Sequence, residues 1–393
     1  MSVQTGLDGL AAGDFNRLAG RNVALLCNQA SIAADLQHAV DLFYKAHRRG
    51  RFTLKALLGP QHGLWGHTQD NMIEWEGYRD PRLDIPVFSL YGEHRKPNDR
   101  MLADVDILVC DLQDVGAKYY TFIWSMAHCM EACAERGIEV LVLDRPNPIG
   151  GLRTEGPWEN AGFESFVGLH PLPVRHGMTI AEIATYLRQH YYPDCELSVE
   201  TMSGWDREMY FADTGLPWAM PSPNVPVAET TIVYPGMCLL EATNLSEGRG
   251  TTRPFDIFGA PWLDGWKLAK SLSDLGLPGV AFRALEFQPT FQKHAGKICQ
   301  GCFIHVTNSD RFKPYLTTIA LLKAVREQNP EAFAWNPPPY EYEYQKLPID
   351  ILNGNDWIRK GIDEGRPLID LEQAWAAECA GFTELRREVL LYR

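Results

Sequence analysis

The sequence predicts an α/β protein in which a domain built on a parallel β-sheet precedes a second, smaller α+β domain. Through the first half of the chain, apolar runs of strand length alternate with helical patterns, which is typical of parallel strands joined by helices. Around residues 217–226 (PWAMPSPNVP) the texture changes to four prolines in ten residues, which indicates a rigid junction. A chain of 393 residues is also long for one hydrophobic core. We therefore predict domains at residues 1–226 and 227–393, the second closing a cleft in the first.

The individual elements follow in chain order. Apolar runs predict strands at Asn22–Cys27, Thr53–Leu58, Pro86–Leu90, Asp106–Leu112, Glu139–Leu143 and Leu197–Thr201. Helical patterns lie at Leu36–Arg49, Tyr120–Glu135 and Thr179–His190. In the second half we expect a helix with a loop end over Gly259–Gly279, a strand at Gly301–Thr307, an amphipathic helix at Pro314–Gln328, and a surface loop packed by its own aromatic rings at Trp335–Tyr344.

Composition and charge narrow the partners and the compartment. The net charge of −13 disfavours nucleic acid and anionic membrane surfaces, although local arginines can still receive small anions. The first twenty residues lack the continuous apolar stretch of a signal peptide, and no run of about 18 apolar residues occurs. Nine scattered cysteines, an odd number, fit free thiols better than a disulfide framework. We therefore predict a cytoplasmic protein.

Polar motifs come directly after each of the first five predicted strands. They are Asn28-Gln29, Gly59–Gly63 (GPQHG), Tyr91–Glu93, Asp111–Asp114 and Asp144–Pro148. In an open parallel sheet, ligands bind in the crevice outside the carboxyl ends of the strands, where such loops converge. The sequence therefore predicts a binding site at this edge.

Several cofactor classes lack their motifs. No glycine follows the first strand, and neither a phosphate-binding P-loop nor a G-x-S-x-G elbow occurs, so we expect no nucleotide cofactor and no acyl-hydrolase serine. Cys299 and Cys302 have the thiol-redox spacing, but they precede a predicted strand, which favours a structural role over redox or zinc chemistry. No metal-binding spacing joins His62 or His176 to the Asp111 and Asp114 pair, so we predict no metal.

Carboxylates are the best catalytic candidates. Cleavage of a glycosidic bond usually needs two, one to protonate the leaving oxygen and one to act as base or nucleophile. Asp114 and Asp111 follow the fourth strand and lie close in sequence to Tyr119 and Tyr120, an arrangement that suits a sugar-binding cleft. Asp114 would equally well cap the next helix. Asp70 and Glu74 lie in a polar and aromatic loop, His67–Tyr78, that is either a lid or an ordinary solvated loop.

Histidine and arginine side chains supply the remaining candidates. His62 and His176 each sit in a glycine-flanked turn, where a structural role is the more common one. The segment Glu241–Phe255 is rich in glycine and polar groups. Within it, Arg249 and Arg253 are suited either to clamping a ligand carboxylate or to a structural arginine network at the domain junction.

Taken together, these motifs resemble a known family, the exo-β-N-acetylmuramidases. The resemblance rests on GPQHGLWG, SLYG, DLQDVGAKYYT, LDRPNPIGG, EGP, LPVRHGMTIAEIA, PSPNVP, YPG and LSEGRGTTRPF, in this order and spacing, and covers nearly the whole chain. It implies a Rossmann-like N-terminal domain that carries the site and a C-terminal domain that closes over it. It also implies release of N-acetylmuramic acid from the non-reducing end of peptidoglycan fragments, with no required cofactor. The lactyl carboxylate of that sugar would suit an arginine such as Arg249.

One position departs from the family pattern. Relatives carry glutamate, the proposed catalytic group, where this chain has Gln61, and an amide can neither donate a proton as an acid nor attack as a carboxylate. Either Asp114, Glu74 or Asp70 supplies the missing function, or the substrate differs, or hydrolysis has been lost. The expected absence of an export signal is a second departure, and it would fit salvage of wall sugars.

The leading hypothesis is an exo-acting glycosidase on an amino-sugar or muropeptide substrate. Asp114, Glu74 and Asp70 are its catalytic candidates. The side chains expected to contact substrate are Gln61, His62, Asp111, Tyr119, Tyr120, Arg145, Asn147, His176, Asn224, Glu241 and Arg249. Two alternatives stay open: a non-catalytic protein that binds muropeptides, suggested by Gln61, and a metal-dependent hydrolase that uses His62, His176 and the aspartates. The sequence does not predict the oligomeric state.

Overall fold

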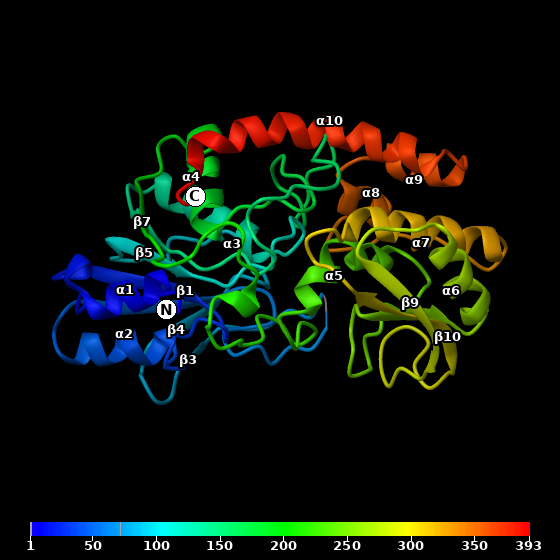
Figure 1. Cartoon of the computed structure of the whole chain (residues 1–393). Coiled ribbons are helices and arrows are strands. Elements are labelled where there is room, and N and C mark those ends of the chain that lie inside the picture. Colours follow the sequence, from blue (N-terminus) through cyan, green and yellow to red (C-terminus); the bar gives the residue numbers. More distant parts are fainter. Residues whose placement is uncertain (1, 71) are drawn as a thin grey trace.

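The computed structural model, which describes residues 2–70 and 72–393, confirms the α/β class (Figure 1). A seven-stranded sheet has the order β3-β4-β2-β1-β5-β6-β7, and every neighbouring pair is parallel except β3 with β4. Its strands are β1 Asn22–Cys27, β2 Thr53–Gly59, β3 Tyr78–Arg79, β4 Pro86–Ser89, β5 Ile107–Asp111, β6 Glu139–Leu143 and β7 Leu197–Glu200. The short edge strand β3 is the one member that the sequence did not predict.

Helices cover both faces of this sheet. They are α1 Gly6–Ala12, α2 Ala39–Arg48, α3 Phe122–Ala134 and α4 Ile180–His190. Parallel strands are joined by right-handed crossovers, and the chain moves from β1 outward to β2 on one side and from β5 outward to β6 and β7 on the other. The helices α3 and α4 therefore lie on the face opposite α2 (Figure 1). The strand order reverses between β1 and β5, which is where an open sheet of this kind forms a crevice.

The second half of the chain contains a three-stranded antiparallel sheet of order β8-β10-β9. Its strands are β8 Ile257–Ala260, β9 Val280–Phe287 and β10 Cys299–Val306, and it packs against α6 Gly265–Asp274. The further helices are α5 Thr230–Met237, α7 Pro314–Gln328, α8 Pro348–Asn353, α9 Trp357–Asp363 and α10 Leu368–Arg386. The predicted helix over residues 259–279 is thus wrong at its start, because residues 259 and 260 pair with β10.

The CxxC pair occupies a place that the sequence did not predict. Cys299 and Cys302 lie inside β10 rather than before it, and both are buried. All nine cysteines are buried free thiols. Burial raises the pKa of Cys299 to about 11 and that of Cys302 to about 12, so neither is an activated thiolate.

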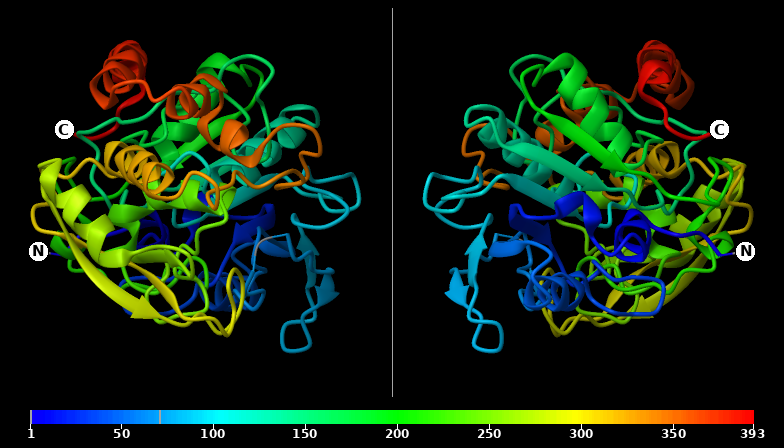
Figure 2. Two further views of the ribbon diagram at one scale, coloured as in Figure 1. Left: turned by 90° about the vertical axis from the view of Figure 1, so that its right-hand side faces the viewer. Right: turned by 90° about the vertical axis from the view of Figure 1, so that its left-hand side faces the viewer.

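The C-terminal residues return to the first sheet. The helix α10 runs along the top of the molecule in Figure 1, and both termini lie on the same side (Figure 2). Tyr392 donates a hydrogen bond of 2.6 Å to Asp144, at the end of β6. The boundary at residues 226 and 227 stays a prediction. Within residues 2–70 and 72–393, none of the helices combines the length and the apolar character needed to cross a bilayer.

Candidate active site

A polar pocket lies where the end of β2 and the start of α3 meet segments from the second half of the chain. Four tyrosines and two glutamates contribute to its walls. The lining residues are Gln61, His62, Tyr119, Tyr120, Thr121, Val167, Ser222, Asn224, Tyr234, Glu241, Arg249, Phe255, Tyr340 and Glu341.

Gln61 is fixed by three polar neighbours in the turn that follows β2. Its carbonyl oxygen accepts a hydrogen bond of 2.6 Å from the hydroxyl of Thr121. Its amide lies 3.2 Å from both the hydroxyl of Tyr91 and Oε1 of Glu341, and donates to them. The side chain is buried, so its orientation is set by this network. The family's carboxylate position is therefore filled by an amide that donates to another carboxylate.

Glu341 is the carboxyl group that receives this amide. Its side chain is 3% exposed, and its Oε2 accepts a hydrogen bond of 2.7 Å from Tyr91. Burial raises the pKa of Glu341 to about 7, and the charge of Glu241 adds to the rise, whereas the hydrogen bonds from Tyr91 and Gln61 oppose it. A glutamate that retains its proton near neutral pH is suited to general acid catalysis.

The backbone around Glu341 is unusual. Both Glu341 (φ 44°) and Tyr342 (φ 69°) adopt left-handed conformations, and Tyr340 and Glu343 close a tight turn around them through two backbone hydrogen bonds of 3.0 and 2.9 Å. Left-handed backbone is uncommon outside glycine and is concentrated at functional sites. This turn corrects the prediction of a surface loop at residues 335–344, because it carries Glu341 into the pocket.

The second pocket carboxylate, Glu241, is paired with arginine. Its Oε1 accepts a hydrogen bond of 2.7 Å from Arg249, and its Oε2 accepts one of 2.6 Å from Tyr340. Arg249 also lies 3.7 Å from Asp70 and 3.8 Å from Glu247, and it stacks over the ring of Phe255. Both Arg249 and Glu241 are buried. Glu341 and Glu241 thus share one pocket but have different surroundings.

His62 lies at the pocket wall in a left-handed turn (φ 70°). Burial lowers its pKa to about 4, so the ring is neutral at pH 7. Its Nδ1 lies 2.9 Å from the carbonyl oxygen of Thr68. Because a carbonyl only accepts hydrogen bonds, Nδ1 carries the proton and Nε2 is left as an acceptor. A neutral ring of this kind suits a sugar hydroxyl or an N-acetyl N–H.

The structure gathers about half of the predicted site residues. Seven line the pocket: Gln61, His62, Tyr119, Tyr120, Asn224, Glu241 and Arg249. A predicted acid, Asp70, reaches the pocket indirectly through its ion pair with Arg249. Glu74 is exposed and lines a different groove beside β3 and β4.

The remaining predicted residues lie deeper, around the strand-order reversal between β1 and β5. Asp111 and Arg145 form a fully buried, two-pronged ion pair with distances of 2.5 and 2.8 Å. Asp114 is 3.2 Å from His176 and accepts a hydrogen bond from the backbone of Gly116. The capping interpretation of Asp114 is wrong, because the N-cap residue of α3 is Thr121, seven residues later, and the helix begins at Phe122.

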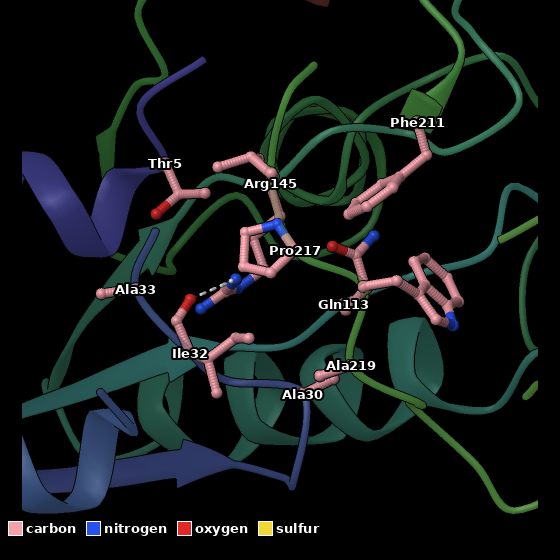
Figure 3. Close-up of a pocket in the computed structure, with 11 residues that line it drawn as sticks. Thr5, Ala30, Ile32, Ala33, Gln113, Arg145, Phe211, Pro217 and Ala219 are labelled. Atoms are coloured by element: carbon pink, nitrogen blue, oxygen red, sulfur yellow. Dashed lines mark hydrogen bonds between the residues drawn. The ribbon is translucent and has the colours of Figure 1, made fainter. Parts of the chain in front are cut away.

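The crevice at this reversal is filled by protein. Only a small pocket is left among the described residues there, and in it Gln113 and Arg145 lie beside Phe211, Pro217 and Ala219 (Figure 3). Arg145 donates a hydrogen bond of 3.0 Å to the carbonyl oxygen of Ile32 (Figure 3).

The proline-rich segment covers this crevice. Asn28 donates to the carbonyl oxygen of Pro221, and Gln29 to that of Met220. Asn147 also bonds to backbone, although outside this segment, because its amide donates to the carbonyl oxygen of Met178. The segment closes the crevice and brings Ser222 and Asn224 to the pocket at the end of β2.

No group of three or more His, Cys, Asp or Glu side chains suited to a metal ion is found in the described part of the chain. His62 lies at the pocket wall, whereas His176 is fully buried beside Asp114. The structure therefore does not bring together the metal ligand set considered from the sequence.

Tyrosine rings pack around the pocket in edge-to-face contacts. Tyr234 lies 5.9 Å from both Tyr119 and Tyr120 and 4.9 Å from Phe255, measured between ring centroids. Two buried carboxyl groups between aromatic rings are the arrangement with which glycoside hydrolases cleave sugars, and this is the class of enzyme that the site suits.

Comparison with known proteins identifies the family. Residues 23–229 match the family model "Exo-beta-N-acetylmuramidase NamZ, N-terminal", and residues 232–392 match the corresponding C-terminal model. The chain is 42% identical over 390 residues to the peptidoglycan beta-N-acetylmuramidase NamZ of Bacillus subtilis (strain 168), covering 99% of this chain and 91% of that protein. The chain belongs to the exo-β-N-acetylmuramidase family, which confirms the resemblance seen in the sequence.

Solved structures support the same conclusion. A DUF1343 family protein of Bacteroides fragilis NCTC 9343 superposes with a TM-score of 0.89 at 32% identity, covering 100% of this chain and 99% of the other. A second DUF1343 family protein of the same organism gives a TM-score of 0.77 at 26% identity, with the same coverage.

Proposed function

We propose that the protein is an exo-acting glycoside hydrolase that releases N-acetylmuramic acid from the non-reducing end of peptidoglycan fragments, and that Glu341 is its general acid. Family membership and the activity named for the Bacillus subtilis relative support the reaction. The observation that carries the assignment is the buried carboxyl of Glu341, hydrogen-bonded to Gln61 and with its pKa raised to about 7. It supplies a proton donor next to the amide that stands in place of the family's glutamate.

Glu341 and Glu241 have different roles because their surroundings differ. Glu341 in its protonated form donates to the leaving glycosidic oxygen. Glu241, in an ion pair with Arg249, supplies negative charge toward the sugar ring, where positive charge develops in the transition state. Arg249 is already surrounded by carboxylates, so its first role is to position Glu241. Its contact with a lactyl carboxylate stays a prediction.

The substrate contacts follow from the pocket lining. The neutral ring of His62 accepts a hydrogen bond through Nε2, and Asn224 offers an amide that already bonds to Gln69. Tyr119, Tyr120 and Tyr234 provide faces against which a sugar ring packs. We place the protein in the cytoplasm, supported by its nine free cysteines, where it would act on salvaged wall fragments.

Turnover of an N-acetylmuramic acid disaccharide by the purified protein tests the proposal. The variants Glu341→Gln and Glu241→Gln keep the shape of each side chain, and we expect both to lower kcat strongly while substrate binding persists. Glu343→Gln is the matched control, because Glu343 lies in the same turn and its Oε1 accepts two backbone hydrogen bonds that an amide oxygen can retain. An inactive wild-type protein that still binds the sugar would favour the alternative of a non-catalytic binding protein.

A further inference from the structure

A second cavity, of about 340 Å³, shares no lining residue with the active-site pocket. It is formed by the loops after β6 and β7 and by residue 310 from the second half of the chain, and three arginines line it: Arg153, Arg175 and Arg207. A neighbouring cavity of about 240 Å³ is also lined by Arg153 and Arg175. These two guanidinium groups therefore border cavities on two sides.

Arg175 is a buried cation that lacks a close ion pair. Its side chain is 4% exposed, and within the described residues it takes part in no ion pair. Its one side-chain hydrogen bond goes from Nη2 to the carbonyl oxygen of Ile149, and its buried Nε has no acceptor. Burial raises the pKa of the nearby Glu155 to about 7 and the charge of Arg175 opposes that rise, so the two groups interact, but the Glu155 carboxyl accepts its hydrogen bond of 2.8 Å from the backbone of Leu316 rather than from the guanidinium group. Burying a guanidinium without an anion is costly, so the missing acceptor is a sign of a ligand.

Positive charge is concentrated behind Arg175 as well. Arg207 pairs with Glu182 at 2.5 Å, but its Nε is buried without an acceptor. Arg386 donates only to the carbonyl oxygens of Gly151, Leu152, His176 and Gly177. Burial and the charge of Arg207 lower the pKa of Arg386 to about 10. Of these three buried guanidinium groups, Arg207 alone forms an ion pair within the described residues, while Arg175 interacts with Glu155 at longer range.

The glycines of the loop motifs allow this arrangement. A side chain at Gly177 (φ 61°) would place its Cβ 2.4 Å from Nη1 of Arg386, and one at Gly151 would come equally close to Nη1 of Arg207. Because Gly151 and Gly177 have no side chains, the guanidinium groups of Arg207 and Arg386 can lie against the backbone. On the rim, Glu208 and Asp310 are exposed carboxylates, which disfavour a large polyanion but leave the arginine floor open to a small one.

We propose that this cavity binds a small oxyanion, a carboxylate or phosphate group, whose oxygens accept hydrogen bonds from Arg175 and Arg153. Arginine is the side chain best suited to such groups, because its planar fork presents parallel N–H donors. The site is separate from the active-site pocket and does not depend on the proposed hydrolysis.

Anion titrations of the full-length protein test this site. Sodium phosphate and sodium succinate are titrated separately at constant ionic strength, with chloride as the balancing salt, while Tm and the heat of binding are measured. We expect at least one of the two anions to raise Tm and to bind saturably. Binding of phosphate alone would indicate a phosphate-bearing ligand, and binding of succinate alone would indicate a carboxylate ligand.

Variants locate the binding. We expect Arg153→Gln to weaken the affinity at least tenfold and Arg175→Gln to abolish binding. Arg153 is exposed, so its variant keeps the test valid even if the Arg175 variant fails to fold. Arg311→Gln is the matched control, because Arg311 is also exposed and follows the cavity residue Asp310 without lining the cavity. The proposal is overturned if neither anion binds beyond chloride, or if Arg153→Gln binds as tightly as the control.

Discussion

The assignment of Glu341 makes a quantitative prediction about pH and leaving groups. At pH 7 an ordinary glutamate, with a pKa of 4.5, is protonated in about one molecule in 300, whereas a pKa of about 7 leaves about half of the molecules protonated. The burial of Glu341 thus raises the population of the acid form about 150-fold, equivalent to about 3 kcal/mol. Because the acid must carry its proton, kcat should fall as the pH rises through about 7.

The variant Glu341→Gln removes both the proton and its titration. General acid catalysis contributes about 10²- to 10⁴-fold, so we expect kcat on an N-acetylmuramic acid disaccharide to fall by that factor and the alkaline limb of the pH profile to disappear. A nitrophenyl glycoside, whose leaving group needs little protonation, should lose much less. Both substrates are assayed from pH 5 to about 9. Equal losses on the two substrates, or an alkaline limb that survives in the variant, would refute the role of Glu341.

Further variants probe the network around this acid and its support. Tyr91→Phe removes a donor that stabilises ionised Glu341, so we expect the alkaline limb to move up by about one pH unit, and an unchanged or lowered limb would contradict the network. Gln61→Glu places two carboxyls about 3.2 Å apart, so we expect the pair to keep a proton to higher pH with activity retained below pH 7, and a profile identical to wild type would exclude the coupling. Lys118→Met leaves Glu159 buried without its 2.6 Å ion pair, which should lower the free energy of unfolding by about 3–5 kcal/mol in urea titrations, and a loss under about 1 kcal/mol would show that the site relaxes.

Most of the first sheet could be predicted because its signal is local. Four strands of five to seven residues are buried along most of their length, and continuous apolar runs such as Asn22–Cys27 predict such strands directly. The strand β9 was missed because it lies at an edge and is half exposed, so its run VAFRALEF mixes apolar and polar residues. The two-residue strand β3 has no pattern of its own to detect.

The sequence predicted those pocket residues that directly follow a strand of the first sheet. Gln61 and His62 follow β2 directly, and the rule that ligands gather at the carboxyl ends of parallel strands placed them correctly. The same rule selected Asp111 and Arg145, but in this chain they neutralise each other and the 217–221 segment covers them. An ion pair formed by two polar strand ends cannot be distinguished from a ligand site by sequence position alone.

Glu341 escaped prediction because its role depends on distant contacts. It lies 280 residues from Gln61 along the chain, in a segment whose prolines and aromatic residues are typical of a surface loop. The available signal was the alternation of glutamate with tyrosine in YEYEY, which suits a wall of aromatic rings around a carboxyl group. Since the first domain contributes the amide, and the second contributes both buried glutamates, the acid and its partner meet only when the two halves of the chain pack together. Catalysis in this family member should therefore be sensitive to any change that loosens the contact between those halves, even where no pocket residue is altered.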